Sequence, residues 1–469
     1  GSLKWLNYNL YRNFGCRNNV FRRRQQGKKT MDKERIEIEN AMLDNLGGKI
    51  LLLQDPTRKR EFIFQAFLEV YNSPKCQKFV KKYKDLNVDK FFEKFLSYGI
   101  IEEFLADPDL EDIMINFLSP IYIHKTKVGM IKTDKRFSSQ DELDLFIKKL
   151  IIFSGRKTIN KINNVELSEV KGRVNIAYSP FGPQITITRA KERPLNIIDL
   201  IKNGTINPEL VAQLWLYVEG LGIKPANIII SGGPGTGKTT LLNALFNFMP
   251  PKQRIVVIED TLELNTDLEE NCSRLESDEQ VTLADLVKNS LRMRPDRVIV
   301  GEVRGREAQD LMTAMNIGKY CMGTLHASTA RETIMRLENE PMNVSEVLIN
   351  LVDVFVIMRR YNLNGKIQRV VGELVETAGM EEKKVLLSSL WYYDLPKQAF
   401  IETAVSSVYR DRLATISGKS PREIMHEIKV RAKIIRTLSD TNVTDSGKLT
   451  ELFRRYCVEP HSVLEELNL

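Results

Sequence analysis

The sequence has few cysteines, and no two of them are spaced as a metal or redox pair would be. There are five in the chain, an odd number, and none forms a C-x-x-C motif with another. This pattern argues against a disulfide framework and against a zinc site, and it is typical of proteins in a reducing compartment. We therefore expect no zinc. The five are Cys16, Cys76, Cys272, Cys321 and Cys457.

Long hydrophobic runs are also missing. No apolar stretch reaches the roughly 18 residues that a transmembrane helix needs, and no secretory signal pattern is found. Apolar residues still make up 42% of the chain, which is enough to build sizeable cores and excludes a disordered protein. We expect a protein of the cytoplasm that acts at the cytoplasmic face of the membrane only through partners.

Acidic residues are absent from the first 30 positions. Residues 1–30 contain eight basic side chains, so the remaining 61 basic residues balance the 61 acidic ones. The net charge of +8 therefore describes a basic leader and not the folded body. Such a leader is either a solvated, flexible segment or a contact for anionic lipid or nucleic acid, and the sequence leaves both open.

Four further segments follow the leader. Residues 31–100 show helical spacing of apolar positions and predict a helical module. Residues 101–195 mix short strands with one helix and predict a small α/β domain, which ends in a linker at 191–194. Residues 206–400 alternate buried strands with amphipathic helices, as in a parallel sheet covered on both faces. Residues 401–469 predict a helical appendage, in which Ser420-Pro421-Arg422-Glu423 forms a capping box.

The third of these segments carries a complete G-x-x-x-x-G-K-[ST] motif. An apolar strand precedes it and a leucine-rich helix follows it, which is the context that a P-loop requires. Its glycines let backbone N–H groups converge on phosphate oxygens, and the helix directs its positive end at the same anion. Lys238 is expected to reach the β- and γ-phosphates, and the hydroxyl of Thr239 to bind Mg²⁺. The expected nucleotide-binding residues are Gly232, Gly233, Pro234, Gly235, Thr236, Gly237, Lys238, Thr239 and Thr240.

Two acidic elements follow the next strands. Glu259 and Asp260 come directly after Ile255-Val256-Val257-Ile258, and Glu302 follows Val298-Ile299-Val300-Gly301. The carboxyl ends of parallel strands face the ligand crevice of such a sheet. We therefore expect Glu259 and Asp260 to orient a water or to bind metal through a water. Glu302 is expected to act as a Walker B residue that activates water and binds Mg²⁺, partly through water.

Histidine is scarce, with four in the chain. One of them, His326, stands in Gly323-Thr324-Leu325-His326-Ala327 at the end of a short apolar segment. Its place downstream of the P-loop indicates a side chain that senses the nucleotide phosphates. The others have no comparable context, and we interpret them as structural or surface residues.

The order of these four motifs resembles the type II/type IV secretion ATPase superfamily. The string Arg292-Met293-Arg294-Pro295-Asp296-Arg297 is most similar to the tight-adherence pilus branch or an archaeal relative of it. The resemblance covers about residues 100–395. It implies a RecA-like core and a hexameric ring of identical subunits that hydrolyses Mg-ATP. The ring would drive pilus assembly, pilus retraction or protein secretion through a polytopic inner-membrane platform protein.

The resemblance also assigns roles to individual residues. Glu259 and Asp260 match the family's Asp box, and His326 matches its His box. Arg173 and Arg189 match arginines that the N-terminal domain contributes to the nucleotide, a role suited to a planar guanidinium. Three arginines near the Walker B strand are weaker candidates for sensing a neighbouring subunit. They are Arg292, Arg294 and Arg304.

The sequence argues against two functions other than a pilus or secretion motor. A DNA-translocating conjugative motor belongs to the same superfamily. However, the folded body is neutral and lacks a basic groove with interleaved aromatic residues, so nucleic acid is an improbable partner. A GTPase would need an N-K-x-D element. The nearest string, Asn160-Lys161-Ile162-Asn163, lacks the aspartate and precedes the P-loop.

Overall fold

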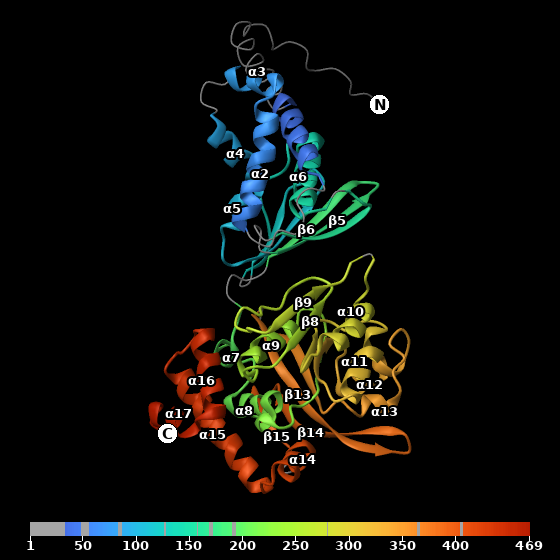
Figure 1. Ribbon diagram of the computed structural model, residues 1–469, viewed down its shortest axis with the longest axis vertical. Coiled ribbons are helices and arrows are strands. Elements are labelled where there is room, and N and C mark those ends of the chain that lie inside the picture. Colours follow the sequence, from blue (N-terminus) through green and yellow to red (C-terminus); the bar gives the residue numbers. More distant parts are fainter. Residues whose placement is uncertain are drawn as a thin grey trace, which may run out of the picture. The chain divides into compact units, whose positions relative to one another are not determined.

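The computed structural model describes residues 33–47, 56–82, 87–125, 128–156, 158–167, 172–189, 194–278, 280–363, 366–403 and 407–469. The chain divides into two compact units, Gly1–Glu192 and Arg193–Leu469 (Figure 1). The predicted basic leader and residues 191–193 of the predicted linker lie outside the described residues. Within the described part, no helix is both long and apolar enough to cross a membrane.

The first unit contains an antiparallel sheet of six strands. Their order is β3-β2-β1-β6-β5-β4. In β5 and β6 buried residues alternate with more exposed ones, as a sheet with one buried face requires. Ile113, Ile115, Ile185 and Ile187 are fully buried on that face. The strands are β1 (Leu110–Asn116), β2 (Tyr122–Lys125), β3 (Gly129–Lys132), β4 (Ile162–Leu167), β5 (Gly172–Ser179) and β6 (Gly182–Arg189).

Helices complete the core of the first unit. Phe67, Phe91 and Phe95 have no exposed surface, and they join one apolar cluster with the inward residues of the sheet. The predicted ranges 31–100 and 101–195 therefore share a core. The helices cover residues 33–46, α2 (Pro56–Tyr71), α3 (Pro74–Lys82), α4 (Val88–Leu96), the 3₁₀ turn η1 (Gly99–Ile101), α5 (Glu102–Leu105) and α6 (Gln140–Phe153).

The second unit is built on a sheet of nine strands in the order β15-β14-β13-β12-β7-β11-β10-β8-β9. The six strands from β12 to β9 are parallel, which confirms the predicted parallel sheet. The antiparallel extension from β13 to β15 was not predicted. The bounds are β7 (Ile228–Gly232), β8 (Ile255–Glu259), β9 (Cys272–Glu276), β10 (Arg297–Val300), β11 (Tyr320–Leu325), β12 (Val354–Leu363), β13 (Lys366–Glu381), β14 (Lys384–Asp394) and β15 (Ala399–Glu402).

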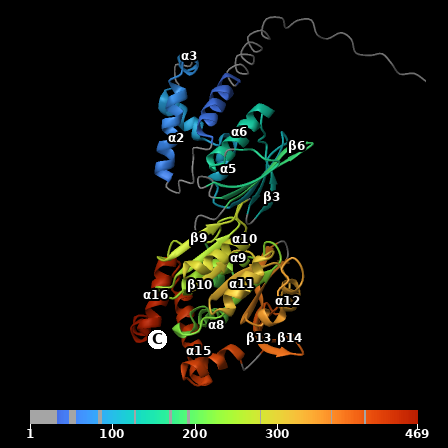
Figure 2. The same ribbon diagram turned by 45° about the vertical axis from the view of Figure 1, so that its right-hand side comes forward.

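Helices cover both faces of this sheet, as Figures 1 and 2 show. Alternate strand residues separate the two cores. Ile228 and Ile230 face one apolar cluster, and Ile229 faces the other. The second cluster includes α10 (Leu283–Ser290), α11 (Glu307–Asn316), α12 (Ala330–Glu338) and α13 (Glu346–Ile349). The first includes α7 (Ile197–Lys202), α8 (Pro208–Glu219), α9 (Lys238–Leu245) and the C-terminal helices.

The C-terminal helices pack into the first of these cores. The ring centroids of Trp215 of α8 and Phe453 lie 4.7 Å apart in a tilted arrangement, and the guanidinium of Arg431 lies 4.6 Å from the centroid of the Trp215 ring. Arg431 also forms a buried ion pair with Glu219 at 2.8 Å. These helices are α14 (Val408–Ser417), α15 (Pro421–Asp440), α16 (Ser446–Val458) and α17 (Pro460–Glu466), and α15 begins with the predicted capping box.

Candidate active site

The P-loop connects β7 to α9 at the carboxyl end of the parallel sheet. Gly235 and Gly237 have positive φ angles of 68° and 94°, which side chains other than glycine adopt at a cost. A Cβ atom on Gly232 would lie 2.7 Å from the carbonyl oxygen of Met358, so glycine is needed there for strand packing. Thr239 and Thr240 lie in the first turn of α9. The backbone can therefore present N–H groups and a helix N-terminus to an anion.

Lys238 turns its ammonium group back onto the loop. Its Nζ donates to the carbonyl of Gly233 at 3.1 Å and lies 3.0 Å from Nδ1 of His326. Burial lowers the pKa of Lys238, although the nearby charge of Glu302 raises it. The P-loop lysine is thus already in contact with the motif predicted to sense phosphate.

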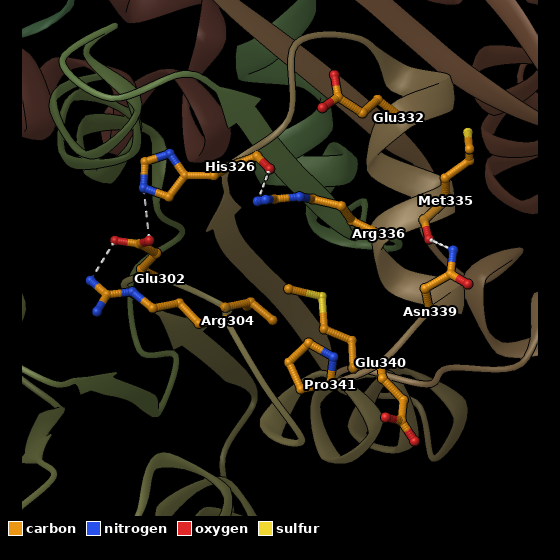
Figure 3. Close-up of a pocket in the computed structure, with 11 residues that line it drawn as sticks. Glu302, Arg304, His326, Glu332, Met335, Arg336, Asn339, Glu340 and Pro341 are labelled. Carbon is orange, nitrogen blue, oxygen red and sulfur yellow. Dashed lines mark hydrogen bonds and ion pairs between the residues drawn. The ribbon is translucent and has the colours of Figure 1, made fainter.

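His326 joins the P-loop to the Walker B strand. Its Nδ1 lies 3.0 Å from Nζ of Lys238 and 3.2 Å from the carbonyl oxygen of Gly232, and its Nε2 is the ring nitrogen that faces Glu302. The distance from Nε2 to Oε1 of Glu302 is 2.9 Å. Figure 3 shows the imidazole directed at Glu302. The strands β7, β11 and β10 are neighbours, and this adjacency brings the three motifs together.

Arg304 links the two acidic motifs. Its Nη2 lies 2.8 Å from Oε2 of Glu302 (Figure 3), and its Nη1 lies 3.1 Å from Oδ2 of Asp260. Burial raises the pKa of Glu302, but the hydrogen bond and charge of Arg304, together with the charges of His326 and Lys238, bring that pKa below its usual value. Glu302 is therefore held as a carboxylate next to the P-loop.

Glu259 differs from its neighbour Asp260 in direction and burial. Its side chain is 2% exposed, and Oε1 accepts from the N–H groups of Glu263 and Leu264 at 2.9 and 3.1 Å. Arg274 lies 3.7 Å from its other oxygen. Gly301 leaves the space that this carboxylate needs, because a Cβ there would lie 2.8 Å from Cγ of Glu259. Glu259 thus shapes the loop after β8, and its role toward water stays a prediction.

A cavity of about 600 Å³ opens beside Glu302 and His326. Arg304, Arg336 and Pro341 also line it, and Arg336 donates to the backbone carbonyl of His326 (Figure 3). The wall therefore carries three carboxylates, those of Glu302, Glu332 and Glu340, of which Glu302 contacts His326, and two guanidinium groups that can face negative charge. This combination suits the reaction of water with a phosphate ester.

Arg173 and Arg189 belong to the first unit. They stand on adjacent strands, where Arg173 pairs with Thr188 and Gly172 with Arg189, so they lie at the same end of the sheet. Nη1 of Arg189 donates to the carbonyl of Asp107 at 2.6 Å. Their contact with nucleotide stays a prediction.

Two arginines beside the P-loop were missed in the sequence. Arg360 and Arg369 lie on β12 and β13, and Nε of Arg369 donates to the carbonyl of Gly235 at 2.9 Å. They stand more than a hundred residues after the motif, in no recognisable string. The only local signal is that the apolar run of β12 ends in two consecutive arginines, Arg359 and Arg360.

The donors at the site suit magnesium better than zinc. The hydroxyl of Thr239 and the carboxylate of Glu302 are hard oxygen ligands, which Mg²⁺ prefers alongside phosphate oxygens and water. Within the described ranges, no three His, Cys, Asp or Glu side chains converge as a protein-only metal site would.

Comparison with known proteins identifies the family. The model of the type II/IV secretion system protein family matches residues 158–442. The uncharacterized protein MJ0900 of Methanocaldococcus jannaschii is 31% identical over 383 residues, which cover 78% of this chain and 69% of that protein. The conjugal transfer protein TrbB of Rhizobium radiobacter is 33% identical over 199 residues, covering 40% of this chain and 60% of that relative.

Solved structures of similar proteins include the ATPase DotB of Legionella pneumophila. It is 18% identical, the match covers 77% of this chain and 95% of that one, and the TM-score is 0.43.

The family model spans more than half of the chain and includes the P-loop, both acidic motifs and His326. This protein therefore belongs to the type II/IV secretion ATPase superfamily.

Proposed function

We propose that this protein binds Mg-ATP at the P-loop and hydrolyses it. The observation that carries the proposal is the continuous series of contacts from Lys238 through His326 to Glu302 and Arg304. A phosphate-binding lysine and a water-activating carboxylate are joined there by one imidazole. A loop with a purely structural role, or one that only bound nucleotide, would not require this arrangement.

The residues of the site divide the work of hydrolysis. Lys238 and the P-loop N–H groups hold the phosphates, and Glu302 accepts a proton from the attacking water as it adds to the γ-phosphorus. The bond to the β-phosphate oxygen breaks, and ADP and phosphate leave. Thr239 would bind magnesium directly and Glu302 through water, and the bound ion would neutralise charge on the phosphates. Arg304 keeps Glu302 ionised for its part as base.

We further propose that hydrolysis drives a homo-hexameric ring on a polytopic membrane platform at the cytoplasmic face. The work would be pilus assembly or retraction, or protein secretion. Membership of the superfamily supports this reading, and the archaeal relative MJ0900 favours an archaeal relation to the tight-adherence branch. A conjugative DNA motor is the second candidate, because one relative is the conjugal transfer protein TrbB.

Nucleotide binding tests the first step of this proposal. Replacing Lys238 by alanine should weaken ATP and ADP binding by roughly 10- to 100-fold, because a charged hydrogen bond to phosphate is lost. The affinity can be measured by fluorescence titration with a labelled ADP and competition by ATP. Lys419→Ala, an exposed lysine at a distant helix end, serves as the control. Equal binding by Lys238→Ala and wild type would contradict the assignment of the P-loop.

An experiment in cells distinguishes a pilus motor from a motor of a motility filament and from one that serves secretion or DNA transfer. The Glu302→Gln variant would replace the native protein in the source organism, and surface filaments and swimming would be scored on the same cells. Loss of thin filaments with intact swimming would identify a pilus motor, and lost swimming a motility filament. If both persist, the pilus proposal is wrong and secretion or DNA transfer is left.

A further inference from the structure

The hairpin formed by β12 and β13 extends past the end of the P-loop strand. β12 runs parallel to β7 until Met358 stands opposite Gly232, where β7 ends. β12 then continues to Leu363, and β13 pairs with it along this extension. Residues at the extended end of the hairpin are therefore carried alongside the P-loop.

Two arginines of this extension reach the loop itself. Arg369 donates from Nε to the carbonyl of Gly235 at 2.9 Å, and its Cδ lies 3.7 Å from the position of a Cβ on Gly237. Nη1 of Arg360 lies 3.5 Å from the position of a Cβ on Gly235. Both guanidinium groups are thus within reach of an anion in the P-loop.

The pairing of these arginines is unfavourable without such an anion. Arg360 of β12 and Arg369 of β13 stand directly opposite each other in the antiparallel pair. Their side chains therefore lie on the same face of the sheet. Like charges at directly opposed positions destabilise a sheet. In the part of the chain that the structure describes, neither forms an ion pair with a carboxylate, whereas the adjacent Arg359 pairs with Glu373. The hairpin therefore concentrates unneutralised positive charge at the loop.

The flank on which they lie indicates the phosphate that they meet. β11 and β10, which carry His326 and Glu302, lie on one side of β7, and β12 lies on the other. The γ-phosphate must face Glu302, because water is activated there. A group that approaches from the β12 side meets the nucleotide nearer its α-phosphate.

We propose that Arg360 and Arg369 form a second anion-binding element that holds the α-phosphate of the bound nucleotide. The bond from Nε of Arg369 to Gly235 fixes its guanidinium, and its two terminal nitrogens are left to donate to phosphate oxygens in a bidentate manner. The proposal rests on nucleotide binding at the P-loop. Because ATP and ADP share the α-phosphate, the pair holds substrate and product alike.

The test compares ATP and ADP affinities in the full-length protein. In Arg360→Gln/Arg369→Gln, both affinities should fall by the same factor, roughly 10- to 100-fold, because the lost contact is common to both nucleotides. The charge-preserving pair Arg360→Lys/Arg369→Lys should recover part of the loss, since a lysine can still face a phosphate. Arg359→Gln is the matched control on the same strand, and its affinities should stay within about twofold of wild type.

Other outcomes overturn the inference. A loss confined to ATP would place the arginines on the γ-phosphate, and unchanged affinities would make them structural. If the double variant fails to fold, the single variant Arg360→Gln, with an exposed side chain, decides the question by the same comparison. If the wild type binds neither nucleotide, the proposed function itself fails; binding by the wild type with equal binding by the variants rejects only this inference.

Discussion

Arg304 is the side chain on which the ionisation of the site depends. It contacts Glu302 and Asp260 at once, and its own pKa is raised by the hydrogen bond to Glu302. A general base has to be deprotonated at the working pH, and a carboxylate next to a lysine and an arginine meets that condition. In the proposed hydrolysis, the arginine would act through the charge of its partner.

Replacing Arg304 by glutamine should therefore move the acid limb of the pH–rate profile to higher pH. Arg304 lowers the pKa of Glu302, so without it Glu302 takes up a proton at a higher pH and the base is lost there. Phosphate release between pH 5 and 8 measures the shift. Arg306→Gln, an exposed neighbour, should leave the profile in place. An unmoved acid limb in Arg304→Gln would show that another group sets the ionisation.

At this scale the sequence predicted the residues that stand in contiguous motifs. Lys238 was predicted from the P-loop string, and Glu302 and His326 from their places after apolar strands. The structure brings the three into contact, and their roles in hydrolysis stay predictions. Arg360 and Arg369 were not found, since their position depends on a hairpin register that no local pattern encodes. The inward direction of Glu259 was equally unreadable, because it follows from the missing Cβ of Gly301.

At the scale of elements, the loop between β8 and β9 is held by an ion pair with α16. Glu269 and Arg454 lie 2.8 Å apart, and the Glu269 side chain is 6% exposed. Burial raises the pKa of Glu269 from 4.5 to about 7, although Arg454 lowers it. The folded state therefore keeps a proton that the unfolded state gives up at lower pH.

This buried carboxyl should make the fold less stable as pH rises. The contribution of protonated Glu269 to the free energy of unfolding is fully present below the unfolded pKa of about 4.5. It is lost as the pH rises through the folded pKa of about 7. Glu269→Gln removes the titration, so its stability relative to wild type should increase by about 1–3 kcal/mol between pH 5 and 8. Urea denaturation at the two pH values measures this. Glu270→Gln, which is exposed, should show a constant difference, and equal behaviour of both variants would refute the assignment.

The elements themselves were predictable where local signals coincide. Thr282 and Ser420 begin helices with complete capping boxes, as their spacing to Asp285 and Glu423 indicates. Four of the six parallel strands, β7, β8, β10 and β11, were visible as short apolar runs before the motifs. The antiparallel strands β13 and β14 were not, because their long, partly polar pattern takes its place in the sheet from pairing with β12.

At the scale of the whole molecule, the C-terminal helices belong to the core of the second unit. Arg431 of α15 is fully buried between Glu219 and Trp215 of α8. Helical periodicity predicted these helices after residue 400, yet it gave no sign that they cover α8. Their partner lies more than 200 residues earlier in the chain, and only the folded chain brings the two together.

Removing Arg431 should therefore destabilise the second unit strongly. Arg431→Ala leaves Glu219 buried without its cation, which typically costs about 3–5 kcal/mol. Arg436 lies on the same helix in an exposed ion pair with Glu209, and Arg436→Ala should cost less than about 1 kcal/mol. Chemical denaturation of the full chain compares the two. Similar small losses of unfolding free energy in the two variants would mean that α15 lies on the surface and adds little to the stability of the second unit.

ATP affinity and ATP turnover in Glu302→Gln together show whether the Glu302 carboxylate activates water. Glutamine keeps the size of the side chain but cannot accept the proton of the attacking water. We expect an ATP affinity within a few-fold of wild type and a turnover reduced by about 100-fold or more. Wild-type turnover in this variant would contradict the account, because the carboxylate that His326 and Arg304 hold beside the P-loop would then have no part in hydrolysis.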